Sequence, residues 1–232
     1  MKALILAAGL GTRLKPLTDT MPKALVPVDG EPMLKKVLDR LISAGYDDIV
    51  VNVHHFADQI RKYIADNQSF GIKIRFSDES DLLRETGGGI RHAEPLLGGP
   101  GAEAFLVHNV DIMSDLDFNW FKSQMHDGDL STLLVSDRKT SRYLLFDDEG
   151  LLVGWKNVLT GEVRSPYSRI DIDKCTPLAF AGIHYVSPGI FPLMRHWGEK
   201  FSIVDFYLEN CRRHAIRAAV PPSLNIRDAG KS

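Results

Sequence analysis

The start of the chain constrains the fold more than any other segment. An apolar run at residues 3–8 breaks directly into a loop that contains Gly9 and Gly11, and three cations follow: Arg13, Lys15 and Lys23. The run has the composition of a buried strand, and glycine lets the backbone approach a ligand closely. Successive N–H groups in such a loop cradle phosphate oxygens, and the cations neutralise their charge. The segment predicts a nucleoside-triphosphate loop at the carboxyl end of a first strand.

Two common phosphate loops do not fit this segment. A Walker A loop has four residues between its glycines and then Gly-Lys-Ser/Thr, which residues 9–13 lack. A dinucleotide fingerprint needs a third glycine or alanine, where this chain has Leu14. The whole pattern, Leu-Ala-Ala-Gly-x-Gly-Thr-Arg-Leu with Pro-Lys ending at Lys23, instead resembles the signature of the sugar-phosphate nucleotidylyltransferases. The alternative is a glycine-rich turn with solvated cations.

Composition favours one soluble domain. The chain has 232 residues, 44% of them hydrophobic, which is enough for one large core. Its net charge of −2 gives no field that favours a nucleic acid or an acidic membrane as a partner. No run approaches the ~18 apolar residues of a membrane span, and no signal-peptide cleavage pattern follows residues 3–8. We therefore expect a cytoplasmic protein with two reduced cysteines, Cys175 and Cys211. The oligomeric state stays open.

Hydrophobic periodicity predicts alternating strands and helices in the first half of the chain. Strands are expected at 3–7, 48–53, 72–76 and 104–108, with helices from Pro32 to Gly45, over 57–65, and from Gly89 toward Leu97. In the second half, strands are expected at 130–136, 143–146, 151–155, 180–186 and 216–220, with helices at 118–125, 188–194 and 203–211. This order indicates a parallel sheet with helices on both faces, extended by antiparallel hairpins.

The predicted fold is a single-domain, Rossmann-like α/β three-layer sandwich with a mixed, mostly parallel central sheet. The family resemblance implies the same nucleotide-diphospho-sugar transferase architecture across residues 1–232. It divides the chain into a nucleotide-binding half, residues 1–115, and a sugar-binding half, residues 116–232. In such sheets ligands bind beyond the carboxyl ends of the strands, which selects residues 8–23, 54–56, 77–89 and 109–115.

The segment 85–89, Glu-Thr-Gly-Gly-Gly, stands in one of these loops. Three glycines before a helix expose backbone groups that suit the edge of a flat base, although a flexible turn before a capped helix is the alternative. The family resemblance implies that Thr86, Gly87 and Gly88 contact the nucleobase. This form of the motif is most similar to the branch that acts on N-acetylmuramic acid 1-phosphate, with heptose- and mannose-1-phosphate enzymes close by.

Two aspartates are candidates for holding Mg²⁺. Asp111 follows a buried strand, and a carboxylate is the hard ligand that Mg²⁺ prefers together with phosphate oxygens and water. Asp115 and Asp117 compete for this role, but Asp117 also suits the cap of the next helix. The resemblance implies Asp111 as one metal ligand and Asp228 as the second. The segment after Asp228 departs from the family pattern at Ala229 and Ser232, so an ordinary polar tail is the alternative reading.

The resemblance implies roles for further residues. Those implied to bind the nucleotide are Leu6, Ala7, Ala8, Gly9, Gly11, Thr12, Arg13 and Lys23, together with the Thr86 segment. Arg13, Lys23 and Asp111 are the residues implied to act in catalysis. Asn109, Glu162 and Gly182 are implied to lie near the sugar, although packing roles explain Glu162 and Gly182 equally well. Trp155 is expected in the core rather than as a sugar platform.

The implied reaction joins a nucleoside triphosphate to a sugar 1-phosphate and releases pyrophosphate, with Mg²⁺ as cofactor. The attacking phosphate oxygen is already anionic, so the reaction needs no general base, and the chain shows no His-Asp or Ser-His pattern that would supply one. The muramic-acid resemblance favours UTP. Three alternatives remain: a GTP-using mannose- or heptose-1-phosphate enzyme, a phosphocholine-type cytidylyltransferase, and a non-catalytic module that binds nucleotide sugars.

Overall fold

The computed structural model describes residues 1–98 and 102–230, and Ser232 of the C-terminal motif lies outside them. The N-terminal half of the sheet is parallel, in the order β6-β1-β4-β5. These strands are β1 (Lys2–Leu6), β4 (Asp48–Val53), β5 (Lys73–Asp78) and β6 (Phe105–Asn109). Each agrees with the predicted strand to within two residues at either end, because apolar and β-branched residues fill the buried centre of the sheet.

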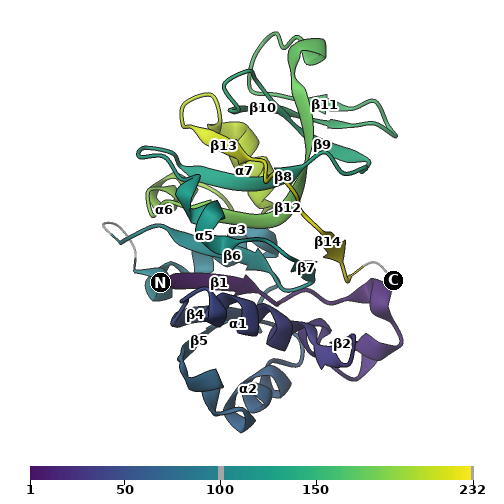
Figure 1. Ribbon diagram of the computed structural model, residues 1–232, viewed down its shortest axis with the longest axis vertical. Helices are drawn as coiled ribbons and strands as arrows, with labels where there is room; N and C mark the ends of the chain where they lie inside the picture. Colours follow the sequence, from purple (N-terminus) through teal and green to yellow (C-terminus); the bar gives the residue numbers. More distant parts are fainter. Residues whose placement is uncertain (99–101, 231–232) are drawn as a thin grey trace.

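The C-terminal half extends the same sheet mainly by antiparallel pairing, in the order β11-β10-β9-β12-β6, with β8 beside β12 and β13 parallel to β8 (Figure 1). These strands are β8 (Ser131–Ser136), β9 (Arg142–Phe146), β10 (Leu152–Asn157), β11 (Val163–Arg164), β12 (Thr176–Val186) and β13 (Ile216–Ala219). The mixed sheet confirms the predicted fold class. Parallel pairing predominates only in the N-terminal half.

Helices cover both faces of the sheet. One core layer joins Ala3 and Ile5 of β1 to α1 (Met33–Ser43), α2 (Ala57–Asp66) and α5 (Phe118–Ser123). The other joins Leu4 of β1 to α3 (Glu85–His92), α4 (Glu94–Leu97), α6 (Ile190–Met194) and α7 (Ile203–Asn210). Successive side chains of β1 enter opposite layers because a strand alternates its faces. The three-layer arrangement is therefore confirmed.

Two short two-stranded sheets were not predicted. One pairs β2 (Pro27–Val28) with β3 (Glu31–Pro32), and the other pairs β7 (Ile112–Ser114) with β14 (Ile226–Asp228). The β7–β14 pair brings the end of the described chain back to the carboxyl edge of the main sheet, at the right of Figure 1. Strands of two or three residues carry too little periodicity to be recognised from sequence.

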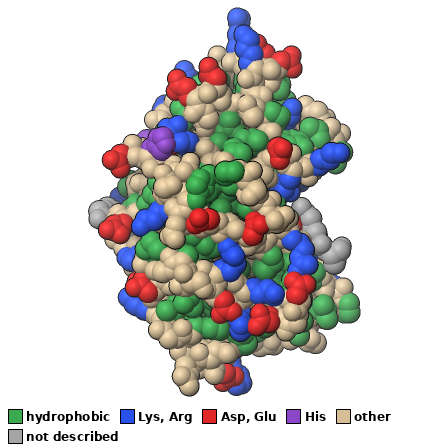
Figure 2. All heavy atoms as spheres, in the orientation of Figure 1, with side chains coloured by type: hydrophobic (Ala, Val, Ile, Leu, Met, Phe, Trp, Pro, Cys, Tyr) green, Lys and Arg blue, Asp and Glu red, His purple; other side chains and the backbone are tan. Residues whose placement is uncertain are grey.

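Both cysteines are free thiols, as predicted. Among the described residues, the helices are all too short or too polar to cross a membrane. On the face seen in Figure 2, acidic and basic side chains are interspersed and form no broad patch of one sign, which agrees with the nearly balanced composition.

Candidate active site

A cavity of about 620 Å³ lies at the carboxyl ends of β1, β4 and β6. Its volume is in the range typical of small-molecule sites. The residues that line it are Leu6, Ala8, Gly9, Arg13, Lys23, Asn52, Leu83, Glu85, Thr86, Asn109, Val110, Asp111, Arg142 and Ser202. The structure therefore brings the first, third and fourth predicted segments together around one space. Asn52, Arg142 and Ser202 lie outside the predicted segments, whereas Leu83, Glu85 and Val110 lie within them but were given no role.

The glycine loop has a fixed shape. Gly11 has a φ of +65°, and a Cβ there would lie 2.8 Å from Cγ2 of Thr18 and 2.9 Å from Cβ of Lys23. The Thr18 hydroxyl donates a hydrogen bond of 2.9 Å to the Gly11 carbonyl. Glycine is thus required at position 11 both by conformation and by space. Gly11 and Thr12 turn the loop so that Gly9 and Arg13 line the cavity, although Gly11 and Thr12 themselves do not.

Asn52 holds the beginning of this loop. Its side-chain oxygen accepts hydrogen bonds from the backbone N–H groups of Ala7 and Ala8, the second at 3.0 Å. Asn52 is 2% exposed and stands near the end of β4, a strand that is otherwise apolar after its first residue. An asparagine inside such a run is the sequence signal that could have identified this role. Because Asn52 accepts from the N–H groups of both Ala7 and Ala8, neither group is directed to a ligand in this structure.

Lys23 and Asp111 form an ion pair within the cavity, with side chains 17% and 19% exposed. Gly230 lies against this pair, since a Cβ on it would be 2.6 Å from both Oδ2 of Asp111 and Nζ of Lys23. The N–H of Ala229 donates to the Asp111 carbonyl at 2.8 Å, and Asp228 is in register with Ile112. The pairing of β14 with β7 therefore places Asp228 on the strand beside Asp111.

Two carboxylates here have the donor chemistry that a magnesium ion takes. Asp111, directly before β7, and Asp228, in β14, would supply hard carboxylate oxygens beside phosphate oxygens and water, and of the two only Asp111 lines the cavity. Gly230 leaves the Asp111 carboxylate free of a side chain that would otherwise crowd it. The competing aspartates have other partners: Asp117 caps α5, and Asp115 accepts hydrogen bonds from Asn225.

The three glycines of residues 87–89 lie inside α3 and not in a loop before it, which corrects the sequence prediction. The N–H groups of Gly87 and Gly88 donate to the Phe201 carbonyl at 2.9 and 3.2 Å. A Cβ on Gly88 would lie 2.2 Å from the Glu199 carbonyl oxygen, so the glycines let α3 touch the 199–202 segment. These two N–H groups are therefore not directed to a base. Glu85 and Thr86 are the residues of this motif that line the cavity.

Glu85 begins α3 with a φ of +60°, a left-handed conformation that side-chain-bearing residues rarely adopt. Strained residues of this kind gather at binding sites, where the surrounding structure maintains them. The strain at Glu85 therefore coincides with the edge of the cavity.

A second cavity of about 530 Å³ adjoins the first, because Arg142 and Ser202 line both. The sequence-predicted Glu162 lines it together with Trp155, which therefore packs on the core with part of its surface facing this space. The guanidinium of Arg164 lies 5.1 Å from the centre of the Trp155 ring and pairs with Asp205. No hydrogen bond or ion pair engages the Arg142 guanidinium within the described parts of the chain.

Gly182 and Asn109 are in contact. Gly182 has a φ of +75°, and a Cβ on it would lie 2.5 Å from Nδ2 of Asn109, which lines the first cavity. The conformation falls at an irregularity in the pairing of β12 with β8. Gly182 itself lines neither cavity, so it shapes the wall behind Asn109.

The chain is similar in sequence to known proteins. The profile of a family described as nucleotidyl transferase matches residues 2–145. An N-acetylmuramate alpha-1-phosphate uridylyltransferase of Caulobacter vibrioides is 37% identical over 196 residues, covering 81% of this chain and 76% of that protein. A protein of the same name from Neisseria meningitidis serogroup B is 47% identical over 118 residues, covering 51% of this chain. The match spans 50% of the Neisseria protein's length.

The fold also matches solved structures. The crystal structure of HddC from Yersinia pseudotuberculosis complexed with GMP-PN superposes with a TM-score of 0.75, at 24% identity. The superposition covers 99% of this chain and 93% of HddC. At this level of identity the likeness concerns the fold alone.

Proposed function

The chain belongs to the nucleotidyl transferase family, and we propose that it transfers a nucleotidyl group from a nucleoside triphosphate to a sugar 1-phosphate. UTP and N-acetylmuramate 1-phosphate are the favoured substrates, by similarity to the two relatives named above. The observation that carries the proposal is the pair of adjoining cavities, one with the glycine loop, Lys23 and Asp111, the other with Glu162 and Trp155. Two linked spaces suit two substrates that react at their boundary.

The proposed chemistry is a substitution at the α-phosphorus. An oxygen of the sugar 1-phosphate forms a bond to this phosphorus, while the bond to the β-phosphate oxygen breaks and pyrophosphate leaves with the electron pair. No proton has to be removed from the nucleophile. The barrier arises from bringing anions together and from charge at the α-phosphate, so positioning and electrostatic stabilisation supply the catalysis.

Five charged side chains in or beside the cavity have a role in the proposed reaction. Arg13 binds the β- and γ-phosphates that leave, and Lys23 neutralises charge at the α-phosphate or on the incoming phosphate. Arg142 lines both cavities. In this proposal it binds the phosphate groups at the point where the two substrates become joined. Asp111 and Asp228 would hold Mg²⁺, which when bound supplies Lewis-acid stabilisation of the phosphate oxygens. Because Lys23 pairs with Asp111, its ammonium group is held close to the same phosphate oxygens.

Substrate identity is tested by pyrophosphate release in the presence of Mg²⁺. UTP, dTTP, GTP and CTP are each combined with the 1-phosphates of N-acetylmuramic acid, mannose, glucose and heptose. We expect release to be fastest with UTP and N-acetylmuramate 1-phosphate. Release with another pair keeps the transferase and changes its substrates, whereas binding of a nucleotide without release from any pair supports the non-catalytic module.

Asp111→Asn and Lys23→Ala should each lower turnover by about 10²–10³-fold, because each removes an electrostatic stabiliser of the reacting phosphates. Steady-state pyrophosphate release measures the effect. Asp137→Asn and Lys139→Ala make the same chemical changes at exposed positions outside both cavities and should leave turnover unchanged. Since each change leaves a partly buried partner unpaired, circular dichroism and thermal unfolding must show that the variants fold. Near-normal rates in both folded variants would contradict the assignment.

A further inference from the structure

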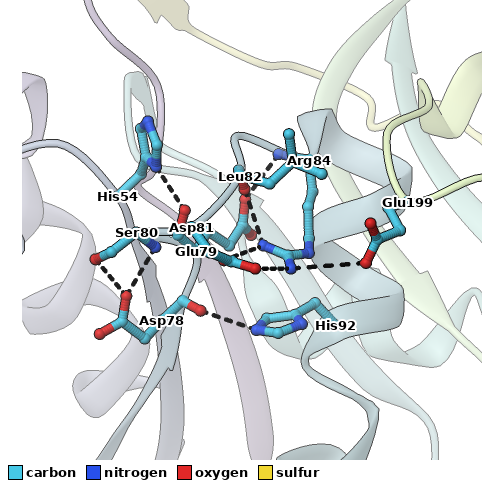
Figure 3. Close-up of polar contacts among 9 residues, drawn as sticks. All are labelled: His54, Asp78, Glu79, Ser80, Asp81, Leu82, Arg84, His92 and Glu199. Atoms are coloured by element: carbon cyan, nitrogen blue, oxygen red, sulfur yellow. Dashed lines mark hydrogen bonds and ion pairs between the residues drawn. The ribbon is translucent and has the colours of Figure 1, made fainter.

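Glu79 is a buried carboxylate that lies outside the cavity. It follows β5 directly and is 0% exposed. A charge in the interior is costly unless hydrogen bonds compensate it. Its main chain is held at both ends, because its N–H donates to the Val53 carbonyl at 2.8 Å and its carbonyl lies 2.6 Å from Nδ1 of His54 (Figure 3).

Both carboxylate oxygens of Glu79 accept hydrogen bonds. Oε1 accepts from the side-chain NH₂ of Asn52 at 2.8 Å, and Oε2 accepts from the backbone N–H of Arg84 at 3.1 Å. The Arg84 guanidinium is itself nearly buried and bonds Asp81 at 2.7 Å, which places a compensating positive charge near Glu79. Figure 3 shows Glu79, Asp81 and Arg84 in the turn before α3.

The two side-chain hydrogen bonds of Glu79 link two segments that border the cavity. Through Asn52, Glu79 reaches the N–H groups of Ala7 and Ala8 at the start of the glycine loop. Through Arg84 it holds the residue that precedes α3, whose Glu85 and Thr86 line the cavity. The third glycine of the motif belongs to the same arrangement, since a Cβ on Gly89 would lie 2.8 Å from Oε1 of Glu79 and 3.0 Å from Nδ2 of Asn52.

The direction of the hydrogen bond between Asn52 and Glu79 decides which way the Asn52 amide is turned. The Asn52 amide can turn its oxygen either to the glycine loop or to Glu79, and only the first orientation gives the Ala7 and Ala8 N–H groups an acceptor. A carboxylate can only accept hydrogen bonds. Glu79 therefore pairs with the NH₂ group of Asn52, which leaves the side-chain oxygen of Asn52 directed to the glycine loop.

We propose that Glu79 is a positioning residue whose carboxylate fixes the Asn52 amide and thereby holds the glycine loop in its nucleotide-binding shape. The inference rests on the proposed function only in taking the first cavity as a nucleotide site. Glu79 touches no substrate and acts through Asn52.

Glu79→Gln tests the polarity while keeping the shape. A glutamine has one accepting oxygen and one donating NH₂ group. This NH₂ group therefore points either to the Arg84 N–H or to the Asn52 NH₂, and both of these are donors. In the second case Asn52 must turn over, and its NH₂ then meets the Ala7 and Ala8 N–H groups. Asn52→Asp keeps the acceptor toward the loop but sets a second carboxylate against Glu79.

The double variant Asn52→Asp with Glu79→Gln restores every contact. The aspartate introduced at position 52 accepts from the Ala7 and Ala8 N–H groups. The glutamine introduced at position 79 donates its NH₂ to that aspartate, and its oxygen accepts from the Arg84 N–H. The total charge is that of the original pair. A residue that served only to fill space or to hold the turn would not be rescued by this exchange.

The experiment measures the affinity for UTP and GTP by titration calorimetry without sugar phosphate, and the KM and kcat for pyrophosphate release. We expect about tenfold weaker nucleotide binding in each single variant, as for an unsatisfied buried polar group, and recovery to within about threefold in the double variant. Asp81→Asn removes a charge from the same turn without touching Asn52, and it should stay within about twofold of the original protein. Thermal unfolding identifies variants that do not fold.

The outcomes separate this inference from the proposed function. Folded single variants that bind nucleotide normally, or a folded double variant as weak as the single ones, would overturn the role of Glu79. If the original protein binds nucleotide but releases no pyrophosphate, the transferase proposal fails while the binding series still decides the role of Glu79. If it binds neither nucleotide, both proposals fall.

Discussion

At the scale of single residues, Gly182 illustrates how backbone conformation shapes the candidate site. Gly182→Ala should lower the free energy of unfolding by about 2 kcal/mol, because a left-handed φ costs an alanine roughly 1–2 kcal/mol and the new Cβ would also lie 2.5 Å from Nδ2 of Asn109. The displaced Asn109 lines the first cavity, so the KM values should rise as well. Urea unfolding and pyrophosphate release measure the two effects.

Gly128 provides the matched control for this change. It has a φ of +88° and nothing within 4 Å of an added Cβ, and it lines neither cavity. Gly128→Ala should therefore lose about 1 kcal/mol from conformation alone and keep its KM values. If both variants altered KM equally, the contact between Gly182 and Asn109 would not matter to the site.

At the scale of elements, α3 and the 199–202 segment form the wall beside Glu85 and Thr86. The Phe201 carbonyl accepts from the N–H groups of Gly87 and Gly88, which satisfies two of the amides that the first turn of a helix leaves free. The Ile203 N–H in turn donates to the hydroxyl oxygen of Thr86 at 3.0 Å, so each helix contributes to the start of the other. This mutual capping explains why the glycines lie where α3 and the start of α7 come into close contact.

Gly88→Ala tests whether α3 and the 199–202 segment are tightly packed or can move apart easily. In an uncrowded helix interior, replacing glycine by alanine would stabilise the protein by up to about 1 kcal/mol. Here the Cβ would lie 2.2 Å from the Glu199 carbonyl oxygen, and crowding of this kind typically costs about 1–3 kcal/mol. We therefore expect net destabilisation in urea unfolding, while Gly198→Ala, with nothing within 4 Å, should be nearly neutral. A more stable Gly88→Ala variant would mean that the two segments separate freely.

At the scale of the whole molecule, sequence patterns predicted most elements because burial and periodicity agree along them. The strand at Asp48–Val53 was predicted with its observed bounds, and α1 ends just before Gly45, which has a φ of +86°. The glycine motif failed because its helix depends on contacts with Glu199 and Phe201, more than a hundred residues away in sequence. Local propensity, which assigns glycines to loops, was overridden there by tertiary packing.

The candidate site likewise contains residues that local sequence patterns predicted and residues that they did not. Arg13 and Lys23 stand in one continuous motif, Asn109 and Asp111 stand at or just after the end of a strand, and the structure gathers all four at one cavity. Arg142 and Ser202 reach that cavity from the second half of the chain, and no local pattern distinguishes them from other polar residues. Their position depends on the pairing of β9 with β12 and on the contact of α7 with α3, which only the folded structure specifies.

The centre of the sheet also sets how the whole molecule responds to acid. His108 of β6 and His184 of β12 lie on adjacent central strands and are buried. Burial disfavours the charged imidazole, which lowers the pKa of His108 to about 4 and that of His184 to about 3. The folded state therefore holds both rings neutral at pH 5, whereas the unfolded chain protonates them below its ordinary pKa of about 6.5.

Stability should consequently fall as the pH drops below about 6.5, because the unfolded state then binds more protons than the folded state. Two histidines that are neutral in the fold and protonated in the unfolded chain lose about 4 kcal/mol between pH 7 and pH 5, at about 1.36 kcal/mol per pKa unit for each. Urea unfolding at the two pH values measures this difference. His184→Gln should remove about half of it, whereas His196→Gln, at an exposed site, should leave it unchanged. Equal losses in the original protein and the His184 variant would mean that His184 is not kept neutral by the fold. The chain has eight histidines, so the comparison with His184→Gln, rather than the total loss, isolates the contribution of a buried ring.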